Sequence, residues 1–160
     1  MNPLIEISKK SAINGMEMFL RNFSHVPDDK LNWTPAPTAK SALRIAAHTA
    51  LYASRFAKMI REAQLPQMSS VEMYMAQVES EELAITDRAE IEPIFRKGTE
   101  EVWAALDTLT PELIESTLQS GPDFSMSMRF LMTLPGWHAT LHCGQIDFLQ
   151  TCWGDQEIYF

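Results

Sequence analysis

The sequence lacks the segments that would place the chain in a membrane or direct it out of the cell. No apolar run approaches the ~20 residues that a membrane-spanning helix needs. The N-terminus has neither the basic segment nor the long apolar segment that is typical of a secretory signal. We therefore expect no membrane contact and a cytoplasmic location.

Positive charge is scarce. The chain has 13 Lys and Arg against 21 Asp and Glu, which gives a formal net charge of −8. The basic residues form no stripe of the kind that neutralises the phosphates of a nucleic acid. A nucleic-acid partner is therefore not expected, and the acidic excess favours solubility without specifying a fold.

Cysteine is rare, and the positions of the two cysteines exclude a disulfide between them. Cys143 and Cys152 lie nine residues apart in one predicted helix, so a rise of ~1.5 Å per residue separates them by ~13 Å. A disulfide needs Cα atoms within ~7 Å of each other. We expect both thiols to be reduced, as is usual in the cytoplasm, and both side chains to be buried as small apolar groups.

Strand signals and internal repeats are also missing, and the apolar residues recur at helical spacing. We predict one all-α domain over residues 1–160, folded as an antiparallel four-helix bundle. The long helices are expected at residues 3–22, 42–62, 87–109 and 127–153. Residues 67–86 are polar and only weakly periodic, with room for one short helix at 71–78. This segment is long enough to form a crossing connection between the second and third long helices.

Three residues bear on how the helices end and pack. Gly98 lies on the apolar stripe of the third long helix, where the missing side chain would allow a neighbouring helix to approach closely. Gly154 suits the C-terminal cap of the last helix. Pro135 predicts either a kink in that helix or its true start, because proline has no backbone N–H to donate.

Histidine is scarce too, yet three of the four histidines follow a metal-ligand pattern. His138 and His142 are about one helical turn apart, so their imidazoles face the same way ~6 Å apart. His48 lies on the apolar stripe of the second helix, whereas His25 lies beside a turn and is expected to be solvated. A lone histidine on such a stripe is usually a hydrogen-bonded core residue, but three imidazoles without partners would each cost ~1–3 kcal/mol. One divalent metal ion satisfies all three and retains an open position.

Other polar residues are weaker candidates. Gln145 lies three residues after His142 on the same face. It either orients that histidine or a metal-bound water, or is an ordinary polar neighbour. The carboxylates of the crossing segment could supply a general base, but we interpret them as a solvated acidic run: Glu79, Glu81 and Glu82.

Three sequence blocks carry a resemblance to a known family. They are Leu31-Asn32-Trp33-Thr34-Pro35, then Ser41-Ala42-Leu43-Arg44-Ile45-Ala46-Ala47-His48, then His138-x-x-x-His142-Cys143-Gly144-Gln145-Ile146. In this order and spacing, the chain is similar over essentially its whole length to the DinB-like (YfiT-like) superfamily. The resemblance implies a four-helix bundle, often a homodimer, with one nickel or zinc ion held by the matching histidines: His48, His138 and His142.

The resemblance also implies a function. Family members with known activity include transferases and isomerases that use low-molecular-weight thiols such as mycothiol or bacillithiol, and others are described as metal-dependent hydrolases. The chain is therefore expected to act on a small-molecule substrate, with no catalytic side chain assigned. The alternative is a metal-binding, stress-associated helical bundle without turnover. Cys143 stands where the family commonly has an arginine, so that contact to an anionic substrate is not carried over to this chain.

Overall fold

The computed structural model describes residues 2–67 and 70–159, which are mostly helical with one small sheet. The α-helices of this part are α1 (Pro3–Ser24), α2 (Ala42–Glu62), α3 (Val71–Ala84), α4 (Ile91–Asp107), α5 (Pro111–Ile114) and α6 (Met128–Cys152). Short 3-10 turns, η1 (Asp28–Lys30) and η2 (Arg88–Glu90), precede α2 and α4. Strands β1 (Thr117–Ser120) and β2 (Phe124–Ser127) lie between α5 and α6. The all-α expectation therefore holds for the larger part of the chain.

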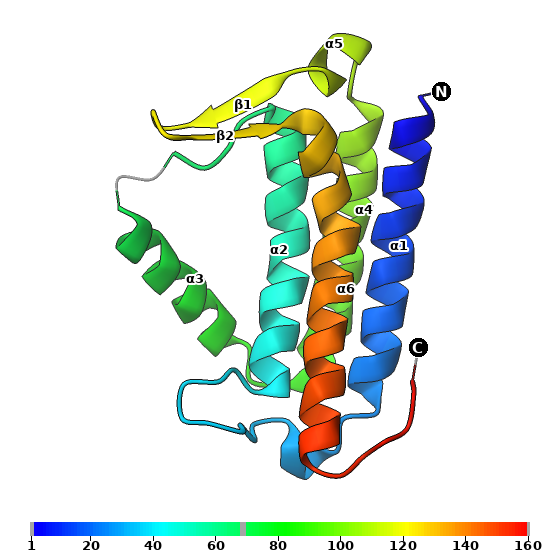
Figure 1. Ribbon diagram of the computed structural model, residues 1–160, viewed down its shortest axis with the longest axis vertical. Helices are drawn as coiled ribbons and strands as arrows, with labels where there is room; N and C mark the ends of the chain where they lie inside the picture. Colours follow the sequence, from blue (N-terminus) through cyan, green and yellow to red (C-terminus); the bar gives the residue numbers. More distant parts are fainter. Residues whose placement is uncertain (1, 68–69, 160) are drawn as a thin grey trace.

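The long helices α1, α2, α4 and α6 lie side by side (Figure 1). α1 packs along α6 and α2 packs along α4, and the two helices of each pair run in the same direction. The two pairs run in opposite directions and meet where α2 contacts α6 and α1 contacts α4. α3 stands away from this body and carries the chain from the end of α2 back toward the start of α4 (Figure 1), as expected for the crossing connection.

Side-chain caps and a glycine fix where the helices begin and end. Ser41 and Ser127 each accept a hydrogen bond from the backbone N–H three residues ahead, at 3.3 and 3.2 Å. Because Ser127 is the N-cap of α6, Pro135 lies inside this helix and does not mark its start. Gly154 follows α6 with φ of +94°, a left-handed conformation that suits glycine and confirms the predicted cap.

Two connecting segments differ from the prediction. The short helix expected at 71–78 extends to residue 84 as α3, and residues 68–69 of the polar segment lie outside the described part. No strand was expected, but β1 and β2 pair as an antiparallel hairpin whose turn contains Gly121 at φ +69°. The strands have only four residues each and are mostly exposed, so they lack the apolar alternation that would predict them.

The core consists of two clusters of buried side chains, one toward each end of the long helices. Phe19 and Phe95 lie in the first cluster, and Ile60, Leu106 and Leu131 lie in the second. Burial of such apolar side chains is the main source of folding free energy. None of the helices in the described residues combines the length and the apolar character that a membrane crossing requires.

The sequence pattern of residues 127–153 predicts an inward stripe that includes His138, His142, Phe148 and Cys152, but the buried face of α6 is rotated relative to this stripe. The buried face includes Cys143 as expected, but Phe148 is 63% exposed and Cys152 is exposed as well. The rotation arises because α6 packs against both α1 and α2, so its core-facing sector lies between these two helices. His138 and His142 consequently lie at the edge of the core instead of its centre.

Glycines allow the closest approaches between helices. A Cβ on Gly98 would lie 2.7 Å from the Cβ of Ala53, so α4 and α2 approach closely as predicted. A Cβ on Gly136 of α6 would lie 2.6 Å from the backbone carbonyl of Ser11 in α1, and this backbone has no flexible end that could move aside. Gly144 of α6 has nothing within 4 Å of the corresponding position.

Gly136→Ala is expected to lower the free energy of unfolding by about 2 kcal/mol, since overpacking against fixed backbone typically costs ~1–3 kcal/mol. Gly144→Ala, in the same helix, should raise it by up to about 1 kcal/mol because alanine is the better helix former and the space is open. Urea denaturation followed by circular dichroism measures both. A Gly136→Ala protein as stable as the wild type would show that α1 and α6 are not held at this distance.

Candidate metal centre

The three predicted histidines meet where α2 and α6 face each other. His48 comes from α2, His138 and His142 come from α6, and the candidate ligand nitrogens lie within 4.8 Å of one another. Nε2 of His138 is 3.2 Å from Nε2 of His48 and 3.1 Å from Nε2 of His142. His25 lies elsewhere, at the end of α1, where its exposed ring stacks on Tyr159.

Hydrogen bonds to the outer ring nitrogens orient two of the imidazoles. Nδ1–H of His48 donates to Oε1 of Glu82 at 2.6 Å, and Nδ1–H of His142 donates to Oε1 of Gln145 at 2.6 Å. With the proton on Nδ1, the lone pair on Nε2 faces the cluster. Gln145 thus orients His142, which was one of the two interpretations from sequence.

The spacing suits a metal ion. Nε2 lone pairs that face one another cannot satisfy each other, because an acceptor needs a donor. A zinc-type ion binds imidazole nitrogens at ~2.0–2.1 Å, and tetrahedral geometry then separates the ligand nitrogens by about 3.3 Å. The separations of 3.1 and 3.2 Å are close to this value. The cluster could therefore hold one divalent metal ion through three nitrogens.

Burial keeps the imidazoles neutral. The ring of His138 packs against those of Tyr52 and Phe56, with centroids 5.1 and 5.3 Å away. Burial, together with the neighbouring histidines, lowers the pKa of His138 to about 2. Burial also lowers the pKa of His48 and of His142, against the opposing effect of their hydrogen-bond partners. Neutral imidazole is the form that binds a metal ion.

Glu82 is the functional residue that the sequence analysis missed. A solvated run was predicted for Glu79, Glu81 and Glu82, and this is wrong for Glu82, whose side chain is only 2% exposed. It accepts hydrogen bonds from His48 and from Nζ of Lys40, the latter at 2.5 Å. Burial raises the pKa of Glu82, but the hydrogen bonds from Lys40 and His48 outweigh it, so the pKa lies below its usual value. The ionised carboxylate fixes the His48 ring and increases its basicity as a ligand.

The same carboxylate attaches α3 to the rest of the protein. In α3 only Val78 and Glu82 are buried. Arg44 of α2 donates to the backbone carbonyls of Glu82 and Ile85. The spacing of Val78 and Glu82, four residues apart on one face of a helix, is the sequence signal that could have predicted the buried carboxylate.

Cys143 flanks the histidines and does not join them. Its buried sulfur lies toward α1, where Nδ2 of Asn22 donates to it at 3.4 Å. Burial raises the pKa of the thiol, which disfavours the reactive thiolate. Cys143 and Cys152 are both free, so the prediction of no disulfide between them is confirmed.

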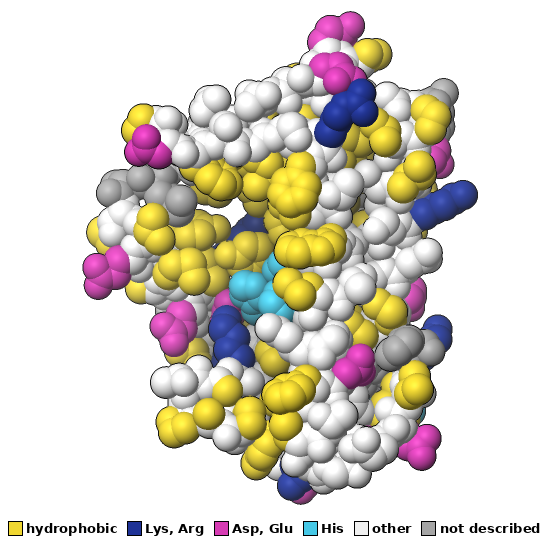
Figure 2. Space-filling view, viewed as in Figure 1, with side chains coloured by type: hydrophobic (Ala, Val, Ile, Leu, Met, Phe, Trp, Pro, Cys, Tyr) yellow, Lys and Arg dark blue, Asp and Glu magenta, His cyan; other side chains and the backbone are white. Residues whose placement is uncertain are grey.

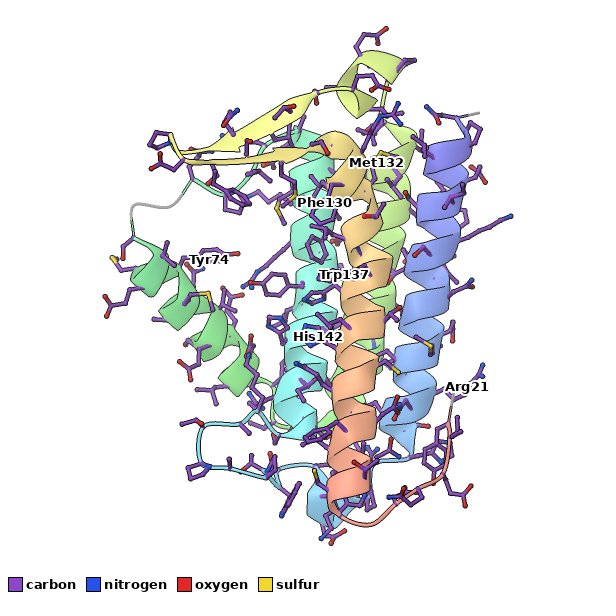
Figure 3. All side chains as sticks on the ribbon, in the orientation of Figure 1. Arg21, Tyr74, Phe130, Met132, Trp137 and His142 are labelled. Carbon is purple, nitrogen blue, oxygen red and sulfur yellow. The ribbon has the colours of Figure 1, made fainter. Side chains whose placement is uncertain are left out.

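The cluster is accessible from one face of the molecule. Figure 2 shows the histidines at the surface, beside a hollow between α3 and the hairpin that is bordered by hydrophobic side chains. His142 and the exposed aromatic residues Phe130 and Trp137 come from the same helix, α6 (Figure 3). A small molecule can therefore approach the Nε2 atoms from this side.

Comparison with known proteins identifies a family and similar folds. The sequence profile of the DinB superfamily matches residues 15–146, which include all three clustered histidines. A DinB-like protein from Bacillus subtilis has a TM-score of 0.67 at 18% identity, covering 99% of this chain and 96% of that one. A conserved protein from Enterococcus faecalis has a TM-score of 0.69 at 14% identity, covering 94% and 96%. At these identities, the structural likeness shows a common fold alone. The comparison with curated proteins found no significant match.

Glu82→Gln is expected to weaken metal binding ~10–100-fold, because the variant removes the negative charge that supports His48. Glu79→Gln is the matched control, since this exposed carboxylate of α3 should leave the affinity unchanged. Competition against a chelator of known affinity gives the dissociation constants. Equal affinities for Glu82→Gln and Glu79→Gln would contradict the assigned role.

The metal-free protein should lose stability as the pH falls below about 6.5, the pKa of an unfolded histidine. The pKa of His138 is lowered to about 2 by burial, so below pH 6.5 the unfolded chain binds a proton that the folded chain does not. This difference in proton binding leaves the free energy of unfolding unchanged at pH 7.5 and lowers it by about 2 kcal/mol at pH 5. Urea titrations at both pH values measure it. A His138→Leu protein should show a smaller drop, and an equal drop would refute the assignment to His138.

Proposed function

The chain belongs to the DinB superfamily, and on that premise we propose that it is a divalent-metal-dependent enzyme that transfers a low-molecular-weight thiol to a small electrophile. One observation carries the proposal: three Nε2 atoms from two helices converge, and no fourth ligand from the described residues joins them. Structural zinc sites are typically closed by four protein ligands, whereas catalytic sites keep one position open.

The residues that would hold the metal are His48, His138 and His142, and their imidazole nitrogens suit nickel or zinc. A divalent ion bound by three neutral ligands keeps its positive charge, which lowers the pKa of a thiol or water and supplies a nucleophile near neutral pH. Glu82 and Gln145 hold the rings of His48 and His142 in the tautomer that this binding requires.

The surrounding side chains favour thiol transfer over hydrolysis. Hydrolysis benefits from a general base, but the buried carboxylate of Glu82 is already occupied by His48 and Lys40. The ion would acidify a bound water as well as a thiol, but hydrolysis of an amide or ester also needs a proton transferred to the leaving group, whereas displacement of a halide by a thiolate does not. Lys40 is half-exposed and close enough to lower the pKa of His48 and His142, so its charge also favours an anion beside them.

The proposal includes a four-helix bundle and a homodimer, which the family implies, together with a cytoplasmic location. An exposed apolar row on α6 supports the dimer, because monomers rarely expose large apolar patches. Its members are Phe130, Trp137, Leu141 and Phe148. The free thiols of Cys143 and Cys152 are consistent with a reducing compartment.

The test combines metal analysis with a thiol conjugation assay. Elemental analysis should find about one divalent ion per chain, lost in His138→Ala and retained in His25→Ala. The loaded protein should accelerate conjugation of bacillithiol, mycothiol, glutathione or coenzyme A to a chlorinated nitrobenzene. The acceleration should disappear in His138→Ala and largely survive in Cys143→Ser, since the nucleophile belongs to the cosubstrate.

Three outcomes would contradict this proposal in different ways. Loss of rate in Cys143→Ser with the metal retained would place the nucleophile on the protein. Hydrolysis of a simple ester or amide without any thiol conjugation would favour a metal-dependent hydrolase. If the protein carries its metal ion but shows no activity in either assay, a metal-binding protein without turnover would be favoured.

A further inference from the structure

We propose that the cavity between α2 and α3, next to the metal centre, binds a carboxylate group of the substrate through Arg55 and Lys58. The inference rests on the proposed function, because it names the chemical class of ligand that reaches the same centre.

The cavity has the size of a small-molecule site. Its volume is about 370 Å³, within the range of ~300–1,000 Å³ that ligand pockets occupy. α2 contributes Arg55, Lys58 and Met59, and α3 contributes Tyr74, whose side chain extends toward α2 (Figure 3). Glu62, at the end of α2, and residues 64–67 complete the lining. The cavity is therefore formed where α3 diverges from α2.

One aromatic ring connects this cavity to the histidines. The ring of Tyr52 lies 4.4 Å from the ring of His48 and 5.1 Å from that of His138. The guanidinium carbon of Arg55 lies 5.0 Å from the centroid of the same Tyr52 ring. A ligand group held by Arg55 is thus separated from the histidine cluster by a single side chain.

Arg55 is oriented by the protein but retains unused hydrogen-bonding capacity. Its guanidinium lies near the rings of Tyr52 and Tyr74, and Nη2 donates to Glu81 at 2.5 Å. Nη1 is buried and has no acceptor among the described residues. A guanidinium has five N–H donors and binds carboxylates through two of them at once. Arg55 therefore offers a preformed donor for a carboxylate.

The local charge differs from that of the whole chain. The net charge is −8, yet the positive charges of Arg55 and Lys58 balance two carboxylates here: Glu62, which lines the cavity, and Glu81, which pairs with Arg55. This balance of charge tolerates a group with a single negative charge better than one with two. A doubly charged phosphate would meet stronger repulsion from Glu62 and Glu81. A carboxylate is the better match.

Two pairs of probes test the subsite by isothermal titration calorimetry on metal-loaded and metal-free protein. The thiol pair is mercaptopropionate and mercaptoethanol, and the electrophile pair is chloronitrobenzoate and chlorodinitrobenzene. A carboxylate distinguishes the two members of each pair. If the protein binds the carboxylate-bearing thiol more tightly than the neutral one, and shows no such difference for the electrophiles, the carboxylate belongs to the thiol. If the difference appears only for the electrophiles, the carboxylate belongs to the electrophile. Either result supports the subsite.

Arg55→Gln should weaken binding of the carboxylate-bearing probe about tenfold and leave the neutral probe unchanged. Lys58→Gln, at an exposed position where folding is not at risk, should weaken the same probe about twofold to threefold. Arg61→Gln is the matched control, since Arg61 is exposed on α2 outside the cavity lining. Glu81→Gln should strengthen binding, because it removes the carboxylate that competes for Arg55.

If the ion pair between Arg55 and Glu81 only holds the structure together, Glu81→Gln should have the opposite effect on affinity. The variant would then loosen α3 and bind the carboxylate-bearing probe more weakly. That result, or equal affinity of the wild type for charged and neutral probes, would overturn the proposal. Arg55 is not a candidate metal ligand, so measurements on the metal-free protein test the carboxylate subsite separately from the proposed metal-dependent function. Carboxylate discrimination there would uphold the subsite even if the loaded protein bound no thiol.

Discussion

The convergence of three neutral imidazoles on one point is the constraint on which the rest of the arrangement depends. The Nε2 atoms are only 3.1–3.2 Å apart, and their lone pairs repel each other unless a cation lies between them. The packing of the helices must therefore hold the three rings in place. The two apolar clusters, one toward each end of the long helices, fix α2 against α6. Hydrogen bonds from Glu82 and Gln145 then select the tautomers that direct the lone pairs inward.

The position of the cluster at the edge of the core balances two requirements. Burial is sufficient to keep His138 uncharged over the physiological pH range. At the same time, the histidines can be reached from the face where α3 diverges from α2 (Figure 2). A fully central cluster would meet the first requirement only, since no small molecule could approach it. The rotation of α6 that exposes Phe148 is what moves the histidines to this boundary.

The sequence predicted the features that depend on local periodicity. The long helices and the pairing of His138 with His142 follow from residues within one or two turns, and His48 follows from its place on an apolar stripe. The rotation of α6 could not be predicted, because it depends on contacts with two other helices. Glu82 was missed for a similar reason: its neighbours are solvated carboxylates, and only the contact with α2 distinguishes it. The hairpin lacks an apolar alternation, so only its turn residues could have indicated it.

α3 is attached to the body of the protein by few buried groups, chiefly Val78 and Glu82. Its other side chains, including Tyr74, face the cavity or the solvent and contribute little to the two apolar clusters. Mutations at these positions can therefore change the shape and charge of the cavity without unfolding the chain. Through this one helix, natural selection can reshape the cavity while the histidine cluster is preserved, provided that the hydrogen bond between Glu82 and His48 is retained.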